Sequence, residues 1–201
     1  RSRLLRTVVD AVGSTPMLRL ERVARDAPDV EVYLKLEFAN PGGSVKDRPA
    51  LRMMLDAIAD GRLTSDKTLI DATSGNTGVA YSLVGAALGY AVELVMPANV
   101  TQARKDITAA FGSRLTFSSP MEGSDGAIRL ARELVERHPE RYFYCDQYSN
   151  PSNPAAHYHG TGAEIVEQCD GKLDYIVLTA GTGGTITGIA RRVKEVVTNA
   201  K

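Results

Sequence analysis

Three short turns carry the residues of this sequence that are best suited to catalysis or ligand binding. The first, residues 40–50, reads NPGGSVKDRPA and places Lys46 between a glycine pair and an apolar pattern with helical spacing. Pro49 is tolerated in the first turn of a helix, and Asp47 favours a helix N-terminus by its charge. A lysine held near a positive helix end, inside a cleft, is disfavoured in its charged form and becomes a usable amine nucleophile. A solvated surface lysine is the alternative interpretation of this turn.

The second turn, residues 73–78, reads TSGNTG and connects an expected strand to an expected helix. Its hydroxyl groups, its amide and its backbone N–H groups suit an anion bound at the helix N-terminus. The alternative is a polar turn whose Ser and Asn side chains only cap the helix.

The third turn, residues 181–185, reads GTGGT and precedes the last expected helix. Its glycines allow the backbone to approach a phosphate closely, and the helix start supplies N–H donors. The turn is not a nucleotide P-loop, because no Gly-Lys-Ser/Thr follows. It is not a dinucleotide fingerprint either, because Ile186 stands where the third glycine belongs. A plain tight turn remains the alternative interpretation.

The elements that must position these turns alternate between strand and helix, which predicts an α/β protein with parallel sheets. The expected strands are residues 30–38, 68–73, 91–96, 114–118, 142–146 and 175–180. The expected helices are residues 50–61, 77–88, 101–111, 124–138 with Ser124 as cap, 161–169 and 185–197. The fully apolar 175–180 segment predicts a central strand, and residues 148–154 predict a loop that crosses between two lobes. Ligands of such sheets bind beyond the carboxyl ends of the strands.

Composition indicates an ordinary globular protein. The 201 residues are 43% hydrophobic and 24% charged, with a net charge of zero, so neither nucleic acid nor an anionic membrane is an expected partner. No apolar run approaches the roughly 18 residues of a membrane span, and the basic N-terminus lacks the apolar core of a signal peptide. The two cysteines, Cys145 and Cys169, have no metal-ligand spacing. We therefore expect a reduced, cytoplasmic protein without a metal site.

A candidate nucleophilic lysine, an anion-binding loop and a separate phosphate-binding loop together suit pyridoxal 5'-phosphate (PLP). The motifs NPGGSVKDR, TSGNTG and GTGGTITG occur in the order and at separations comparable to those of the fold type II PLP enzymes, and the stretch DQYSNPSNPAAHY is also typical of them. On these motifs the chain resembles that family, and within it cysteine synthase and cystathionine β-synthase. KDRPA, EGSDGA and HYHGTGAE favour the B-type cysteine synthases, some of which use O-phosphoserine. CDGKLD followed by GTGGTITGIAR is instead similar to cystathionine β-synthase.

The resemblance implies a role for each residue of the three turns. Lys46 would carry PLP as a Schiff base and act as the acid–base group at the substrate α-carbon. Asn76 would hydrogen-bond the phenolate oxygen of the ring. The cofactor phosphate would be held by Gly181, Thr182, Gly183, Gly184 and Thr185. The substrate carboxylate would be bound by Thr73, Ser74, Gly75 and Thr77, with Gln147 from the other lobe.

The resemblance also implies a fold with two lobes. Residues 1–43 would begin the large lobe, residues 44–145 would form a small mobile lobe, and residues 146–201 would continue the large lobe with its phosphate-binding loop. Family members continue well beyond Lys201, with further strands and a serine that faces the ring nitrogen. The resemblance therefore implies that the C-terminal part of the large lobe is absent from this sequence, and no residue takes the role of that serine.

The implied activity is PLP-dependent β-replacement, in which O-acetylserine or O-phosphoserine reacts with sulfide to give L-cysteine. The implied assembly is a homodimer, with an acyltransferase as a further partner. Three alternatives remain: cystathionine β-synthase activity, serine/threonine dehydratase activity, and a catalytically incomplete module that binds PLP or a partner protein.

Overall fold

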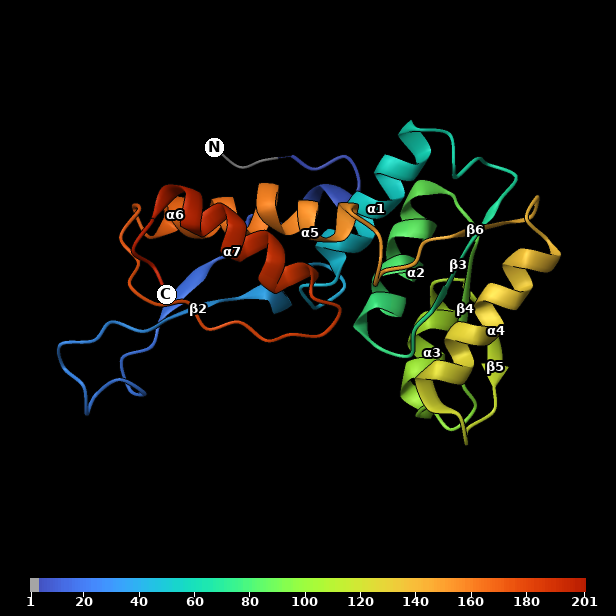
Figure 1. The fold of residues 1–201 in the computed structure, drawn as a ribbon, viewed down its shortest axis with the longest axis horizontal. Coiled ribbons are helices and arrows are strands. Elements are labelled where there is room, and N and C mark those ends of the chain that lie inside the picture. Colours follow the sequence, from blue (N-terminus) through green and yellow to red (C-terminus); the bar gives the residue numbers. More distant parts are fainter. Residues whose placement is uncertain (1–3) are drawn as a thin grey trace.

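A computed structural model describes residues 4–201, so residues 1–3 of the expected large-lobe segment lie outside the described residues. Figure 1 shows a four-stranded sheet and its helices at one end of the molecule, and two short strands with helices α5 to α7 at the other. Helix α1 (Asp47–Ala59) lies between them and packs against both α2 (Asn76–Leu88) and α5 (Ser152–Ala156). In the described part of the chain, no helix has the length and apolarity needed to cross a membrane.

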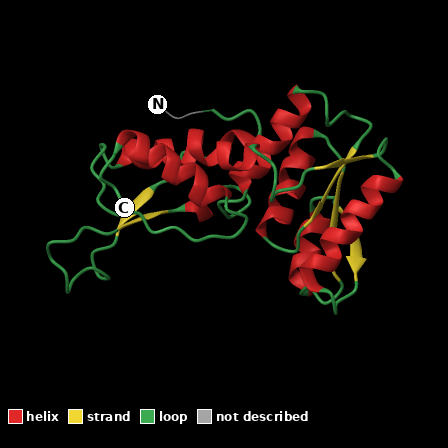
Figure 2. Cartoon of the chain, viewed as in Figure 1, coloured by secondary structure: helices red, strands yellow, loops and turns green. Residues whose placement is uncertain are grey.

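The larger sheet is parallel throughout, with the strand order β5-β4-β3-β6. Figure 2 shows its strands in yellow among the helices at one end of the molecule. Its strands are β3 (Thr68–Ala72), β4 (Val92–Pro97), β5 (Arg114–Ser118) and β6 (Tyr142–Tyr144). The chain adds β4 and β5 on one side of β3 and then returns to place β6 on the other side. Parallel sheets form a ligand-binding crevice where the strand order reverses in this way, beyond the carboxyl ends of the strands.

Helices cover both faces of this sheet (Figure 1). On one face, residues of α1 and α2 such as Met53 and Tyr81 form a core with Leu69 and Leu94 of the strands. On the other face, α4 (Gly123–Arg137) packs against a smaller apolar cluster. Helix α3 (Gln102–Ala110) lies against α2 and β5. Gly85 permits the close approach of α2 to the sheet, because a Cβ there would come within 2.4 Å of a methyl carbon of Val92.

The other end of the molecule is mostly helical. A 3₁₀ turn η1 (Val8–Ala11), the strands β1 (Met17–Arg19) and β2 (Tyr33–Lys35), and a second 3₁₀ turn η2 (Glu37–Ala39) come first. Helix α5 runs through a π-helical turn η3 (His157–Thr161) into α6 (Gly162–Gln168). Helix α7 (Gly184–Val196) packs against all three. Gly188 allows this contact, because a Cβ there would lie 2.2 Å from the Pro154 carbonyl oxygen.

Two expected strands are wrong or too long. Only Tyr33–Lys35 of the expected strand 30–38 is in a strand, and it pairs antiparallel with β1 rather than in a parallel sheet. Residues 175–180 form no strand, although the Ile176 N–H donates to the Lys201 carbonyl oxygen at 2.9 Å. No described strand pairs with this segment, and Val177 is 95% exposed. Apolar residues predict burial, but a strand forms only where a neighbouring strand supplies the hydrogen bonds.

Two expectations about helix starts are also wrong. Ser124 does not cap α4, since the helix begins at Gly123 and Glu122 stands in the capping position. The expected loop 148–154 is already helical from Ser152, so helical structure continues from there to Gln168 instead of starting at residue 161. The prolines at 151 and 154 misled this prediction, because a proline in the first turn of a helix removes no helical hydrogen bond. The other expected strands and helices are confirmed within a few residues of their bounds.

Candidate active site

The backbone around Lys46 is fixed by contacts within its own turn. Lys46 stands immediately before α1, and its backbone N–H donates to Ser44 Oγ at 3.2 Å. The Gly42 N–H donates to the buried carboxylate of Asp47. A Cβ on Gly42 would come within 2.4 Å of Asp47 Oδ1, so only glycine fits there, and Gly43 adopts a left-handed φ of +80°. The glycine pair therefore folds back onto the helix start and holds Lys46 in place.

Lys46 is half-buried, and burial lowers the pKa of its amine. Among the described residues, its Nζ atom has no hydrogen-bond or ion-pair partner. The charge of Lys46 acts on His157, a fully buried residue whose pKa is lowered to about 4, first by burial and then by this charge. Lys46 thus has the properties of an amine nucleophile, and it lies close enough to the η3 turn to influence it.

Arg48, two residues after Lys46, forms an ion-pair cluster that anchors the start of α1. Its side chain is only 5% exposed, and its Nε atom lies 2.7 Å from Glu37 Oε2 while Nη1 lies 2.6 Å from Glu164 Oε1. Lys35 also pairs with Glu164, at 2.7 Å. Burial by itself would raise the pKa of Glu164, but the hydrogen bonds from Arg48 and Lys35 outweigh it and lower the pKa to about 2. The lysine turn is therefore tied to both η2 and α6.

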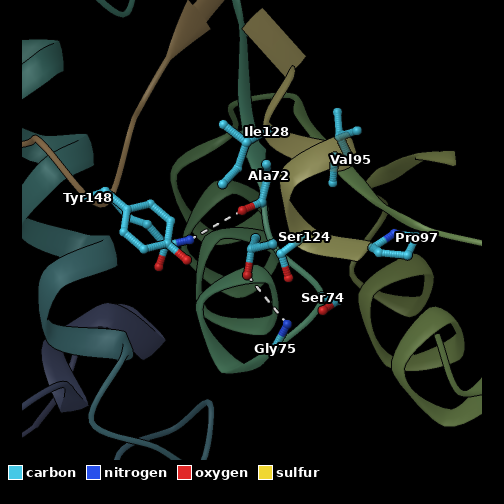
Figure 3. Close-up of a pocket in the computed structure, with 11 residues that line it drawn as sticks. Ala72, Ser74, Gly75, Val95, Pro97, Ser124, Ile128 and Tyr148 are labelled. Carbon is cyan, nitrogen blue, oxygen red and sulfur yellow. Dashed lines mark hydrogen bonds between the residues drawn. The ribbon is translucent and has the colours of Figure 1, made fainter. Parts of the chain in front are cut away.

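The structure brings Gln147 to the predicted carboxylate-binding loop. Thr77 Oγ1 donates to Gln147 Oε1 at 2.8 Å, and Gln147 Nε2 donates to the Ala72 carbonyl oxygen at 3.4 Å. Both side chains are buried, because the neighbouring strands β3 and β6 end at the same edge of the sheet. A pocket of about 170 Å³ opens beside them on the α4 side (Figure 3). Its walls include four predicted substrate-binding residues: Thr73, Ser74, Gly75 and Gln147. Lys46 and residues 181–185 do not line it.

Asn76 is exposed, and its side chain contacts Arg104 on α3. Arg104 Nη1 donates to Asn76 Oδ1 at 2.7 Å. Because a guanidinium only donates hydrogen bonds, the carbonyl side of the amide must face Arg104. The NH2 group of Asn76 is thereby left to donate to a ligand.

Residues 181–185 form the turn into α7. Gly183 has a left-handed φ of +84° and precedes the helix, whose first N–H groups lack intrahelical acceptors and carry the positive end of the helix dipole. Apart from the glycine and its two chain neighbours, no described heavy atom lies within 4 Å of the place where a Cβ would stand on Gly181 or Gly183, so the loop faces open space. Thr182 Oγ1 accepts from Asn153 Nδ2 at 3.0 Å, and Thr185 Oγ1 hydrogen-bonds with His157 Nε2 at 3.2 Å. These features suit a bound anion.

A buried carboxyl group, Asp71, lies beneath the 73–77 loop. It is 1% exposed, and its Oδ2 atom accepts from the Tyr81 hydroxyl at 2.9 Å and from the Gln147 N–H at 3.2 Å. Its Oδ1 atom accepts from the Ala72 N–H at 2.8 Å. Burial raises the pKa of Asp71 to about 7. Asp71 therefore fixes the backbone of Gln147 from the sheet side.

We expect Asp71→Asn to change how stability depends on pH. The folded pKa of about 7 exceeds the usual 3.8, so the folded protein binds this proton more tightly than the unfolded chain does. The stabilisation from this proton is fully present below pH 3.8 and is lost as the pH rises through 7. Urea denaturation at pH 5.5, 7 and 8.5 should show wild type losing stability relative to Asp71→Asn across this range. A constant difference between the two proteins would contradict the prediction.

Comparison with known proteins identifies the family. Residues 8–201 match the family described as pyridoxal-phosphate dependent enzyme. The chain belongs to this family of PLP enzymes. It is 54% identical to a cysteine synthase of Aquifex aeolicus over 190 residues. These residues cover 94% of this chain and 58% of that relative. It is 43% identical over 199 residues to a cystathionine beta-synthase of Dictyostelium discoideum, covering 98% of this chain and 40% of that relative.

The solved structures agree with the sequence relatives. A crystal structure of cysteine synthase from Entamoeba histolytica matches with a TM-score of 0.92 and 38% identity, covering 97% of this chain and 58% of that one. The chain therefore spans little more than half the length of the cysteine synthases it matches. Membership of the PLP enzymes, the α/β fold with a parallel sheet, and PLP as the cofactor are confirmed. The roles of the individual site residues stay predictions.

The residues of the three turns fit PLP. The Lys46 amine is half-buried, has a lowered pKa and has no described partner, as a residue that forms a Schiff base requires. The start of α7 offers N–H donors beside open space for a phosphate. The amide of Asn76 presents a donor, which suits a phenolate oxygen. PLP would be held by Lys46, Asn76 and residues 181–185.

Several residues at the site received no role from the sequence. These are Arg48, Asp71, Arg104, Asn153 and His157. A signal for two of them was present, since the Asn-Pro repeat and the following histidine lie in the DQYSNPSNPAAHY motif. Asparagine and histidine in such a motif are candidates for buried polar contacts. Their partners in the 181–185 loop, however, are far away in the sequence, since Thr182 lies 29 positions from Asn153 and Thr185 lies 28 positions from His157.

We expect Asn76→Ala and Thr185→Ala to fail differently. Thr185 belongs to the predicted phosphate-binding loop, so its loss should mainly weaken PLP retention, by roughly 1 to 3 kcal/mol for a charge-assisted hydrogen bond. Asn76 is predicted to contact the ring, so its loss should shift the cofactor absorbance and slow turnover more than it loosens PLP. Cofactor titration and visible spectra would measure both effects. Equal loss of PLP from the two variants would contradict the separate roles.

Proposed function

We propose that the protein catalyses β-replacement on an O-activated L-serine, either O-acetylserine or O-phosphoserine, with sulfide to give L-cysteine. The observation that carries this proposal is that hydrogen bonds through Gln147 and Asn153 link the second turn to the third. Gln147 hydrogen-bonds to the 73–77 loop, and Asn153 and His157 connect the same region to residues 181–185. Lys46, at the start of α1, acts through its charge on His157, which hydrogen-bonds to Thr185. The similarity to a cysteine synthase at 54% identity supports the same activity.

When bound, PLP supplies a carbonyl that condenses with amino groups and a ring that stabilises negative charge at the substrate α-carbon. Lys46, with its lowered pKa, removes and returns the proton at that carbon. Thr73, Ser74, Gly75, Thr77 and Gln147 bind and orient the substrate carboxylate. Gly181, Thr182, Gly183, Gly184 and Thr185 hold the cofactor phosphate at the positive end of α7.

We also propose that residues 44–145 form a small lobe that moves relative to residues 1–43 and 146–201. Carboxylate binding at the 73–77 loop would draw this lobe over the site and exclude water. This division rests on the family resemblance. A homodimer, a cytoplasmic location and an acyltransferase partner are proposed from the family resemblance alone.

Cystathionine β-synthase activity is the second candidate function. The 43% identity to the Dictyostelium discoideum enzyme over 98% of this chain favours it. This reaction would use the same Lys46 and the same carboxylate-binding loop, but a larger thiol would replace sulfide. Serine/threonine dehydratase activity would need no thiol.

Product analysis with defined substrates tests the proposal. The protein would be incubated with PLP and sulfide plus O-acetylserine or O-phosphoserine, and with serine plus homocysteine in parallel. We expect cysteine from at least one activated serine, at rates well above those of cystathionine or pyruvate formation. Lys46→Ala serves as the matched control and should form none of these products. Cystathionine or pyruvate as the main product would contradict the proposal and favour the corresponding alternative.

A further inference from the structure

Asn153, near the start of α5, connects two parts of the proposed site. Its Nδ2 atom donates to the Gln147 carbonyl oxygen at 2.7 Å and to Thr182 Oγ1 at 3.0 Å. The residue is 3% exposed, so water does not compete for these bonds. One amide group thus joins the predicted carboxylate-binding residue to the predicted phosphate-binding loop.

These two hydrogen bonds of Asn153 determine whether the Thr182 hydroxyl acts as a donor or as an acceptor. The Gln147 carbonyl oxygen can only accept, so the NH2 group of Asn153 must point toward it. The same NH2 group then donates to Thr182, and the Thr182 hydroxyl acts as acceptor. A hydroxyl that accepts one hydrogen bond keeps its own proton for another partner. Thr182 is therefore prepared to donate to an anion in the loop.

Close packing holds Asn153 against the loop. A Cβ on Gly184 would come within 2.0 Å of Asn153 Oδ1, so the amide lies directly on the backbone at the start of α7. On its other side, Gln147 is held by Asp71, which accepts the Gln147 N–H at 3.2 Å. A continuous series of hydrogen bonds therefore runs from the parallel sheet, through Gln147 and Asn153, to Thr182.

We propose that Asn153 is a positioning residue that sets the Thr182 hydroxyl as a donor to the PLP phosphate and keeps the phosphate-binding loop in register with Gln147. This inference rests on the proposed function, because it requires PLP at this site. Asn153 itself touches neither the reacting atoms nor the substrate. Its effect on the cofactor passes through Thr182.

The 5'-phosphate provides a selective test of this role. Pyridoxal has the same ring and carbonyl as PLP but no phosphate, so it cannot use a donor in the 181–185 loop. We expect Asn153→Ala to weaken PLP binding by about 10-fold or more, the loss typical of a hydrogen bond to a charged group, and to leave pyridoxal binding nearly unchanged. Asn153→Asp, which keeps the shape but lacks the NH2 donor and adds a negative charge, should weaken PLP binding further. Titration of the cofactor-free protein, followed by absorbance, measures both affinities.

A double-mutant cycle and a matched control complete the experiment. If Asn153 acts through Thr182, then Asn153→Ala should have little further effect on PLP affinity in a Thr182→Val background. Asn150→Ala is the control, because Asn150 is also buried and bonds to Cys145 and Ser152 but to neither loop of the site. Asn150→Ala should leave the ratio of PLP to pyridoxal affinity at its wild-type value.

The outcomes separate this inference from the proposed function. Equal weakening of PLP and pyridoxal binding by Asn153→Ala, or full additivity with Thr182→Val, would overturn the positioning role alone. Wild-type protein that binds no PLP would overturn the proposed function and this inference together. Thermal unfolding of each variant identifies any that fail to fold, and the nearly isosteric Asn153→Asp carries the comparison if Asn153→Ala does not fold.

Discussion

Replacement of Lys46 with alanine is expected to abolish covalent PLP binding and to lower the proposed turnover by roughly 1,000-fold or more. Lys46 stands at the start of α1 with a half-buried amine, a lowered pKa and no described partner. The other two turns, residues 73–78 and 181–185, contain no lysine, so neither can replace it as nucleophile and as base at the substrate α-carbon. The visible absorbance of the bound cofactor and the initial rate of cysteine formation would measure the two losses.

Lys67→Ala is a suitable control for this experiment. Lys67 lies just before β3, at the end of the strand opposite to the 73–77 loop. Its replacement should leave both the absorbance and the rate at the wild-type values. Wild-type absorbance and turnover in Lys46→Ala would show that the reactive amine belongs to another residue.

Arg48→Ala is expected to produce the largest loss of stability. The change leaves the carboxylates of Glu37 and Glu164 without their main partner in a mostly buried cluster. Removal of one partner of a buried ion pair typically costs about 3–5 kcal/mol in the free energy of unfolding. Urea denaturation at pH 7 would measure this cost. Arg48→Lys should recover only part of it, because an ammonium cannot reproduce the two-sided contact of a guanidinium.

The exposed Arg129 provides the comparison for Arg48. Its side chain is 60% exposed and pairs with Glu122 at 2.6 Å, so Arg129→Ala should cost no more than about 1 kcal/mol. The cost of Arg48→Ala should also depend on pH. The pKa of Glu164 is lowered to about 2 from 4.5, so its contribution is present above pH 4.5 and is lost as the pH falls through 2. Similar costs for the two arginine variants at pH 7 would contradict the account of the buried cluster.

Much of the fold could be predicted because it depends on local patterns. Alternating apolar segments correctly predicted the parallel strands β3 to β6 and the helices between them. Residues 175–180 show the limit of this approach, since apolar composition says nothing about whether a partner strand lies alongside. Residues 30–38 show the same limit. Glu37, at the end of the expected strand, lies instead in a 3₁₀ turn and forms an ion pair with Arg48.

The roles of the site residues stay predictions, but the choice of these residues depends on local patterns as well. The three turns have a recognisable local chemistry, so their residues could be chosen from sequence. The side-chain contacts around the turns could not be predicted, because the two residues of each contact are far apart in the chain. Arg48 and Glu164 are separated by 116 positions, and Asn153 and Thr182 by 29. Packing of the folded chain decides which polar side chains come into contact. The patterns of a single sequence carry no information about that packing.

The central claim is that Lys46 is the residue that holds PLP. Reduction of the PLP-loaded protein with borohydride makes the bond between cofactor and lysine permanent, and digestion followed by peptide mapping then locates it. We predict that the cofactor is found on the peptide that contains Lys46. Its recovery on Lys35 or Lys67 would contradict the account.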